Sequence, residues 1–185
     1  MDREPAPALT TAPVSTDDLA DLVALAARTF PLACPPGTTD DDIDQFVAEH
    51  LSAAAFTGYL ADPSRHLVLA RQHDQPVGYA MCVTGEPADP EVAAVVLDRP
   101  AFEINKFYTD PAWHGSGVAA HLMTAVLDLA RTGGAKVCWL GVNQQNARAQ
   151  RFYAKHGFQV VGTKHFDVGG QLHDDFVMVR AQPYL

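Results

Sequence analysis

The sequence has few cysteines, no apolar run of membrane length and a shortage of basic residues. Three cysteines occur in 185 residues, and this odd, widely spaced set argues against a disulfide framework and against a zinc site. The longest apolar stretch, residues 19–27, is interrupted by Asp21, which is typical of an amphipathic helix and not of a membrane span. Residues 1–7 are charged and contain prolines without a following apolar segment, so they indicate no signal or transit peptide. We therefore expect a cytoplasmic protein without a membrane partner.

The balance of charge excludes one class of partner and favours another. Lysine and arginine number 13 against 22 aspartates and glutamates, which gives a net charge of −9. An acidic surface repels nucleic acid, so we expect no nucleic-acid partner. It attracts small cations, so a positively charged amine is a suitable substrate. An anionic cofactor would need a binding site whose local groups attract it in spite of the net negative charge.

The length is that of one domain. A chain of 185 residues with 48% apolar residues is long enough to bury one core and too short for two. Residues 1–6 are predicted to be a disordered tail, because their prolines and charges cannot form a core. Residues 7–185 are predicted to be a single domain, and its oligomeric state is left open, with a homodimer among the possibilities.

Apolar periodicity predicts alternating strands and helices, which places the chain in the α/β (α+β) class with a central sheet flanked by helices. Turn signals separate the elements, with Gly169 and Gly170 closing the last hairpin. Strands are expected over residues 8–13, 66–71, 76–83, 102–109, 137–142, 159–168 and 174–179. Helices are expected after caps at residues 15 or 16 and 39, and over residues 53–60, 122–130 and 146–156, while residues 30–37 and 85–90 are expected to be a turn and a loop.

A glycine-rich turn joins the strand over residues 102–109 to the helix over residues 122–130. Glycines tolerate backbone conformations that a Cβ would forbid, and the first amides of a helix have no acceptor within it. Such a turn therefore favours a phosphate group without needing a basic side chain. A plain connecting turn is the alternative. The segment comprises His114, Gly115, Ser116, Gly117, Val118 and Ala119.

A second segment lies about twenty-five residues further along the chain. Asn146, Ala149 and Tyr153 are three and four residues apart, so they share one face of the helix over residues 146–156. Ala149 keeps this face flat enough for a long ligand, and Gly157 stands where a left-handed cap ends the helix. The alternative is an ordinary amphipathic helix with Tyr153 packed in the core.

Together these segments resemble the GNAT superfamily of acyl-CoA-dependent N-acetyltransferases. The motif R/Q-x-x-G-x-G/A of that family is matched by residues 114–119 except at the first position, where His114 replaces Arg or Gln. A later family motif is matched by Asn146, Ala149, Tyr153, Gly157 and Phe158. The resemblance implies a three-layer fold around a mixed, mostly antiparallel sheet of six to seven strands, with acetyl-CoA as cosubstrate and no metal.

The resemblance also implies where the cofactor and the reacting groups lie. The amides of Phe107, Tyr108 and Thr109 would hold the acetyl carbonyl and the pantetheine arm, because two neighbouring strands splay apart there. Tyr153 would donate a proton to the leaving thiolate. The resemblance thus gives the expected cofactor-binding residues as Phe107, Tyr108, Thr109, His114, Gly115, Ser116, Gly117, Val118, Ala119, Asn146, Ala149 and Tyr153.

Transfer of an acetyl group to an amine requires the neutral amine, so the site must remove a proton from an ammonium group. Glu103 is the expected base. It lies on the strand before the glycine turn, between apolar neighbours that favour a raised pKa, and its offset from His114 matches the position of the base in many GNAT members. The alternative is a solvated or salt-bridged strand carboxylate.

Other acidic and polar clusters have simpler explanations. The run Asp40–Asp44 is expected to stabilise a helix start, with a place at the mouth of an acceptor pocket as the alternative. Four polar residues flank the last hairpin without a recognisable metal-ligand spacing, and they are interpreted as hairpin polar residues. These four are His165, His173, Asp174 and Asp175.

The identity of the acceptor is the least determined feature. The block from Trp139 to Met178 most resembles bacterial polyamine (spermidine-type) N-acetyltransferases, and the acidic charge agrees with a polyamine. Direct attack on acetyl-CoA in a ternary complex is expected for any amine. Protein or peptide N-acetyltransferases and antibiotic-type small-amine acetyltransferases share the same motifs, so they stay open. A non-catalytic acyl-CoA sensor is the alternative of another class.

Overall fold

Residues 9–182 are described by the computed structural model, and they include a sheet of seven strands. The strands are β1 (Thr10–Pro13), β2 (Arg65–Gln72), β3 (Gln75–Thr84), β4 (Ala101–Thr109), β5 (Val137–Asn143), β6 (Gln159–Val168) and β7 (Gln171–Ala181). They lie in the order β1-β2-β3-β4-β5-β7-β6, and all neighbours are antiparallel except β4 and β5. The predicted tail, residues 1–6, lies outside the described residues.

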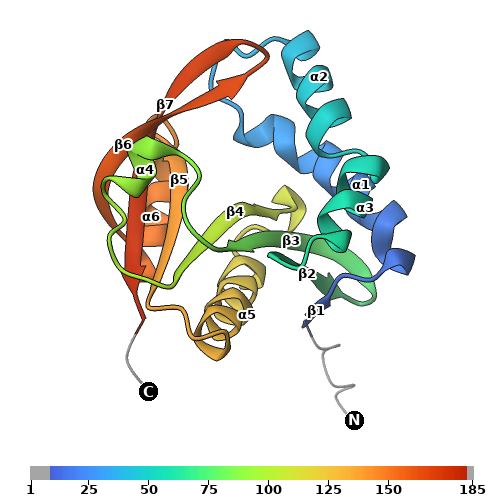
Figure 1. The fold of residues 1–185 in the computed structure, drawn as a ribbon. Helices are drawn as coiled ribbons and strands as arrows, with labels where there is room; N and C mark the ends of the chain where they lie inside the picture. Colours follow the sequence, from blue (N-terminus) through green and yellow to red (C-terminus); the bar gives the residue numbers. More distant parts are fainter. Residues whose placement is uncertain (1–8, 183–185) are drawn as a thin grey trace.

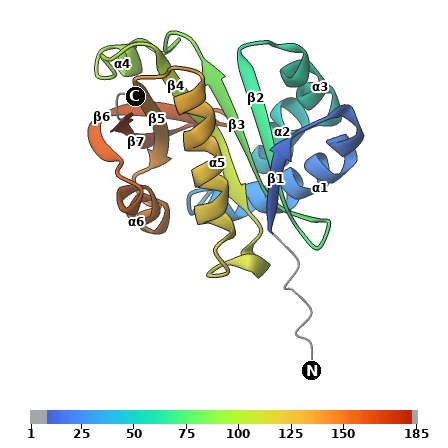
Figure 2. The same cartoon turned by 90° about the horizontal axis from the view of Figure 1, so that it is seen from below.

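Helices cover both faces of the sheet (Figures 1 and 2). They are η1 (Thr16–Asp18), α1 (Leu19–Thr29), η2 (Phe30–Ala33), α2 (Asp40–His50), α3 (Ala53–Ala61), α4 (Pro90–Ala93), η3 (Pro111–Trp113), α5 (Val118–Thr132) and α6 (Ala147–Lys155). One core cluster joins α5 and α6 to one face, and a second joins α1 and α3 to the other. The predicted three layers are therefore confirmed.

Local side-chain chemistry explains where the helices begin. Thr39 caps α2 by accepting a hydrogen bond from the Asp42 amide, as its sequence position predicts. Three short elements, η2, α4 and η3, were not predicted, because one turn of helix is too short to show a period. The segment expected as a turn, residues 30–37, begins with η2, and the loop over residues 85–90 leads into α4.

Within residues 9–182, no helix is both long and apolar enough to cross a membrane.

Strand β4 carries the distortion that shapes the site. Cys82 of β3 faces Ile104 and Met81 faces Lys106, so Asn105 is an extra, bulged residue. The bulge changes which side chains face which layer. Ile104 and Phe107 are three positions apart, so in a regular strand they would lie on opposite faces. Because of the bulge, both pack against the same core cluster.

Strands β4 and β5 separate soon after they meet. Their parallel pairing ends at Glu103 and Trp139, while β4 continues to Thr109 and β5 to Asn143. Each strand keeps its other partner, because β4 stays paired with β3 and β5 with β7. Figure 1 shows the two ribbons running apart. The expected splay near residues 107–109 is therefore present, and it opens the sheet from within.

Candidate active site

The glycine turn has the conformation that the sequence predicts. Gly115 and Gly117 have φ values of +81° and +91°, in the left-handed region that favours glycine. Among the described residues, no atom lies within 4 Å of the place where a Cβ would project from either glycine. Gly117 is the N-cap of α5, so the first amides of that helix open onto this space. The turn is exposed and shaped to hold an anion.

A cavity of about 550 Å³ lies beside the turn, between β4 and α6. Its walls include the turn glycines, the end of β4 and one face of α6. Among the expected cofactor-binding residues, the following line it: Phe107, Tyr108, Thr109, His114, Gly115, Gly117, Ala119, Asn146, Ala149 and Tyr153. Ser116 and Val118 do not line it. Ser116 donates a hydrogen bond to the carbonyl of Trp113 at 2.5 Å, and Val118 is buried in the core.

Positively charged side chains line this cavity, although the protein as a whole is acidic. Arg148, Arg151 and Lys155 line it from α6, and among the described lining residues there is no carboxylate. Arg148 approaches His114 across the cavity, with Nη1 and Nδ1 2.7 Å apart. A guanidinium from α6 therefore lies next to the residue that replaces the Arg or Gln of the family motif.

These three cations were not predicted. Their spacing of three and four residues along α6 is the signal that marks them as one helix face. Only the fold shows that this face lies opposite the glycine turn.

The charge of His114 depends on these surroundings. Partial burial and the positive charge of Arg148 lower the pKa of His114, and they outweigh the opposing effects of the Thr109 backbone and of Asp110. The imidazole is therefore neutral at pH 7, and it offers a hydrogen bond without a formal charge.

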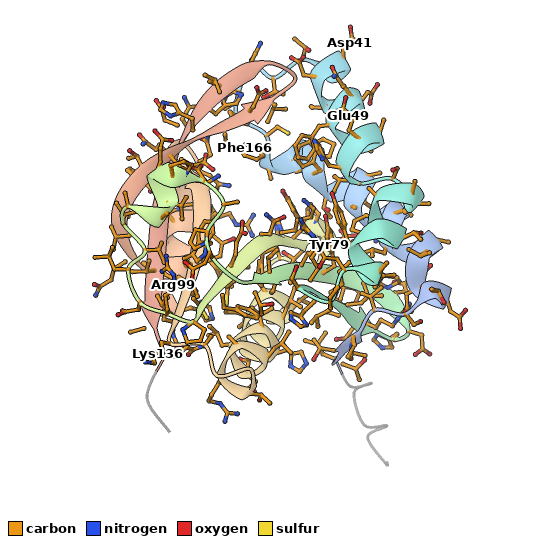
Figure 3. All side chains as sticks on the ribbon, in the orientation of Figure 1. Asp41, Glu49, Tyr79, Arg99, Lys136 and Phe166 are labelled. Carbon is orange, nitrogen blue, oxygen red and sulfur yellow. The ribbon has the colours of Figure 1, made fainter. Side chains whose placement is uncertain are left out.

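A second cavity, of about 190 Å³, opens on the other side of the splay between β4 and β5. The hairpin of β6 and β7 supplies part of its lining, and this hairpin reaches over to α2 (Figure 1). Phe166, labelled in Figure 3, lies on this hairpin, with its ring centroid 6.0 Å from that of Phe46 in α2. The charged residues that line this cavity are Glu103, Lys164 and Asp175.

The two cavities meet at a shared wall. Five expected site residues line both: Phe107, Tyr108, Asn146, Ala149 and Tyr153. Tyr153 is only 8% exposed, and its ring lies edge-on to those of Phe107 and Phe158. It therefore packs in the core, as one interpretation predicts, and it also lines both cavities. Burial raises the pKa of the Tyr153 phenol, which keeps it protonated at neutral pH.

Asn146 has a structural task in addition to its place on the wall. Its Oδ1 accepts a hydrogen bond of 3.1 Å from the Ala149 amide, so it caps α6. The cap leaves the amide NH₂ of Asn146 for other partners. Gly157 ends the helix with φ +85°, as predicted.

Glu103 lies in the smaller cavity and is half-buried. Its Oε1 accepts a hydrogen bond of 2.8 Å from Nδ2 of the bulged Asn105. The bulge therefore fixes the orientation of the carboxylate expected to act as the base.

Asp175 corrects one interpretation of the sequence. It was expected to be a hairpin polar residue, but it is 6% exposed and lines the smaller cavity from β7. Burial raises the pKa of its carboxyl to about 6, against the opposing effects of Lys164, His173 and Asn143. Side chains alternate between the two faces of a strand, so Asp175 shares a face with the buried Val177. This alternation is the sequence signal that could have predicted the burial of Asp175.

The other acidic clusters lie outside both cavities. Asp42 and Thr39 bond to each other at the start of α2, and Asp41 at the same end is exposed (Figure 3). His165 contacts Glu91 at 3.1 Å and Asp174 at 3.6 Å. Across residues 9–182, no group of three or more His, Cys, Asp or Glu is placed to hold a metal ion.

The chain is similar to known proteins in sequence and in fold. The family model described as the acetyltransferase (GNAT) family matches residues 20–158. An uncharacterized N-acetyltransferase of Mycobacterium tuberculosis is 47% identical over 88% of this chain and 97% of its own length. The N-alpha-acetyltransferase RimI of the same organism is 35% identical over 69% and 73%. The crystal structure of the PaiA N-acetyltransferase from Thermoplasma acidophilum, a complex with coenzyme A, shares the fold with a TM-score of 0.75, 17% identity and coverage of 95% and 99%.

The contact between His114 and Arg148 generates a prediction about titration. Replacing Arg148 with Gln removes a positive charge that opposes protonation, so the pKa of His114 should rise toward its usual value. NMR of the imidazole nitrogens during a pH titration measures this. Arg151→Gln is the matched control and should leave the pKa of His114 unchanged. An unaltered His114 pKa in Arg148→Gln would show that the two side chains are not in contact.

Proposed function

Because the chain belongs to the acetyltransferase (GNAT) family, we propose that it transfers the acetyl group of acetyl-CoA to a primary amine by direct attack in a ternary complex. One observation carries this proposal most directly. A cationic cavity beside a glycine turn and a smaller cavity with carboxylates share the wall that contains Tyr153. A donor in the first and an acceptor in the second would meet at that wall.

The first cavity suits the phosphates and the pantetheine arm of acetyl-CoA. The left-handed Gly115 and Gly117 leave room for a diphosphate at the amides of Val118 and Ala119, as at other helix N-termini. Arg148 supplies the charge that His114 lacks. Successive amides of a strand point to opposite edges, and the Asp110 amide donates to Val77 of β3, so the amides of Phe107 and Thr109 face the splayed edge of β4 and the Tyr108 amide faces β3. The Phe107 and Thr109 amides can donate to a carbonyl oxygen of the ligand.

The residues of the second cavity account for the proton transfers. The acceptor enters as an ammonium ion and must lose one proton before its nitrogen can attack the acetyl carbon. The carbon–nitrogen bond then forms, the carbon–sulfur bond breaks, and Tyr153 donates a proton to the sulfur. Glu103 accepts the proton that the ammonium loses before the attack and passes it to solvent. After the attack the nitrogen loses a second proton, and this proton restores the phenol of Tyr153. One proton is therefore released for each acetyl group transferred.

The proposed class of acceptor is a primary amine. The comparisons do not support the narrower likeness to polyamine enzymes. RimI is named an N-alpha-acetyltransferase, so polypeptide N-termini belong among the acceptors to test. The acyl-CoA sensor gains no support from the second cavity, since a sensor has no use for carboxylates next to the thioester.

Release of coenzyme A tests the proposal. Acetyl-CoA is supplied with n-butylamine, 1,4-diaminobutane, spermidine or a short peptide with a free N-terminus, and free coenzyme A is measured by chromatography. Saturable release is expected with at least one primary amine and not with its N-acetylated form. Binding of acetyl-CoA without release for any amine would favour the sensor, and absence of acetyl-CoA binding would refute the proposal.

Replacing Tyr153 with Phe should remove the proton donor and keep the packing. We expect kcat to fall by roughly 100-fold, because loss of a positioned acid costs about that much. The dissociation constant of acetyl-CoA should change by less than about threefold, since the ring remains. Tyr59→Phe is the control, because this phenol bonds to the His50 carbonyl and lines neither cavity. Equal turnover in the wild type and in Tyr153→Phe would remove the proposed acid.

Replacing Glu103 with Gln should affect the pH profile. With Glu103 as base, the rise of kcat/KM with pH should flatten, and kcat/KM should fall about 100-fold at neutral pH. Steady-state kinetics across the pH range measures both effects. Glu86→Gln serves as control, because this exposed carboxylate pairs with Arg99 at the surface. A profile of unchanged shape in Glu103→Gln would count against the base.

A further inference from the structure

The second carboxylate of the smaller cavity lacks a partner that its burial demands. Asp175 is 94% buried, and among the described residues its Oδ1 accepts no hydrogen bond. A buried carboxylate oxygen without a donor is costly, even where Asn143 contacts the same carboxylate, and such oxygens in proteins are usually satisfied by a neighbour or by a ligand. Because Asp175 lines a cavity, a ligand can supply the missing donor.

The position of Asp175 is set by two neighbouring strands. It lies opposite Asn143 of β5 and opposite Lys164 of β6. Gly141 leaves space for both charged ends, since a Cβ built there would lie 3.2 Å from Oδ2 of Asp175 and 2.5 Å from Cε of Lys164. The carboxylate and the ammonium therefore converge over the same glycine, inside the cavity.

The charges of the cavity leave room for one further cation. Glu103 and Asp175 contribute two negative charges, and Lys164 contributes one positive charge. One ammonium ion balances this set. A second positive charge on the same small molecule would approach Lys164 and be repelled, because charges at this depth are weakly screened by solvent.

On the basis of the function proposed above, we propose that Asp175 binds the ammonium group of the acceptor and that Lys164 restricts the acceptor to one such group. The acceptor is then a monoamine, or the single α-ammonium of a polypeptide, with an apolar stem next to the nitrogen. The walls favour such a stem. Their apolar members include Phe30, Ile104, Phe107, Val142, Phe166 and Val168.

The titration of Asp175 agrees with this role. With a pKa of about 6, the carboxyl is mostly ionised at pH 7.5 and becomes protonated below pH 6. The groups that face it are Lys164, His173, Asn143, Asp174 and the protonated phenol of Tyr108. Binding of an ammonium ion favours the ionised form, so acceptor affinity is expected to be greatest above pH 6 and to weaken as the pH falls through 6.

Two amines of equal carbon chain length provide the test. The affinities of n-butylamine and of 1,4-diaminobutane are measured by calorimetry at pH 7.5 with coenzyme A present in excess, so that binding occurs without turnover. The wild type should bind the monoamine at least tenfold more tightly. Asp175→Asn should weaken n-butylamine binding at least tenfold, and Lys164→Met should bring the two amines within about threefold of each other.

The controls separate this inference from the proposed function. Asp128→Asn makes the same change at an exposed carboxylate of α5 that lines neither cavity, and it should leave both amine affinities unchanged. Coenzyme A affinity is measured alone for every variant, and unchanged values show that the fold and the first cavity are intact. Tighter binding of the diamine, no binding of n-butylamine, or undiminished binding in Asp175→Asn would overturn the inference while coenzyme A still binds. Loss of coenzyme A binding in the wild type would instead refute the proposed function.

Discussion

The separation of β4 from β5 is the constraint on which the rest of the site depends. The two strands pair only over residues 101–103 and 137–139, and afterwards each keeps one partner of its own. Backbone groups on the facing edges thus lose the partners that a continuous sheet would provide, and such groups need other acceptors and donors. The bulge at Asn105 lies just beyond the last pair of β4 and β5, and its side chain orients Glu103. A ligand between the strands would restore the missing pairing.

The gap divides an acidic protein into two electrostatic environments. On one side, α6 supplies Arg148, Arg151 and Lys155 to the larger cavity. On the other side, Glu103 and Asp175 supply negative charge to the smaller cavity. In the proposed mechanism an anionic donor and a cationic acceptor are each attracted to their own side. The net charge of −9 then favours the acceptor, and the cluster on α6 offsets it locally for the donor.

Much of the fold and part of the candidate site could be predicted from local sequence patterns. The other features depend on pairing between strands far apart in the sequence. The left-handed Gly115 and Gly117 and the strand–turn–helix around them follow from glycine spacing within ten residues. Apolar periodicity also locates the strands and helices, but it does not specify the order β1-β2-β3-β4-β5-β7-β6 in which the strands pair. Asp175 and Arg148 were missed because their importance arises from neighbours far along the chain. Asp175 enters the cavity only through its register with β5 and β6, which no local pattern specifies.

Amide hydrogen exchange with and without coenzyme A tests the central claim most directly. If the cofactor lies in the gap, exchange should slow at Phe107 and Thr109 on β4 and at residues 115–119 around the glycine turn, because their amides gain acceptors and lose contact with water. The rest of α5 should change little. Protection confined to other parts of the chain, with coenzyme A bound, would contradict the placement of the cofactor between β4 and β5.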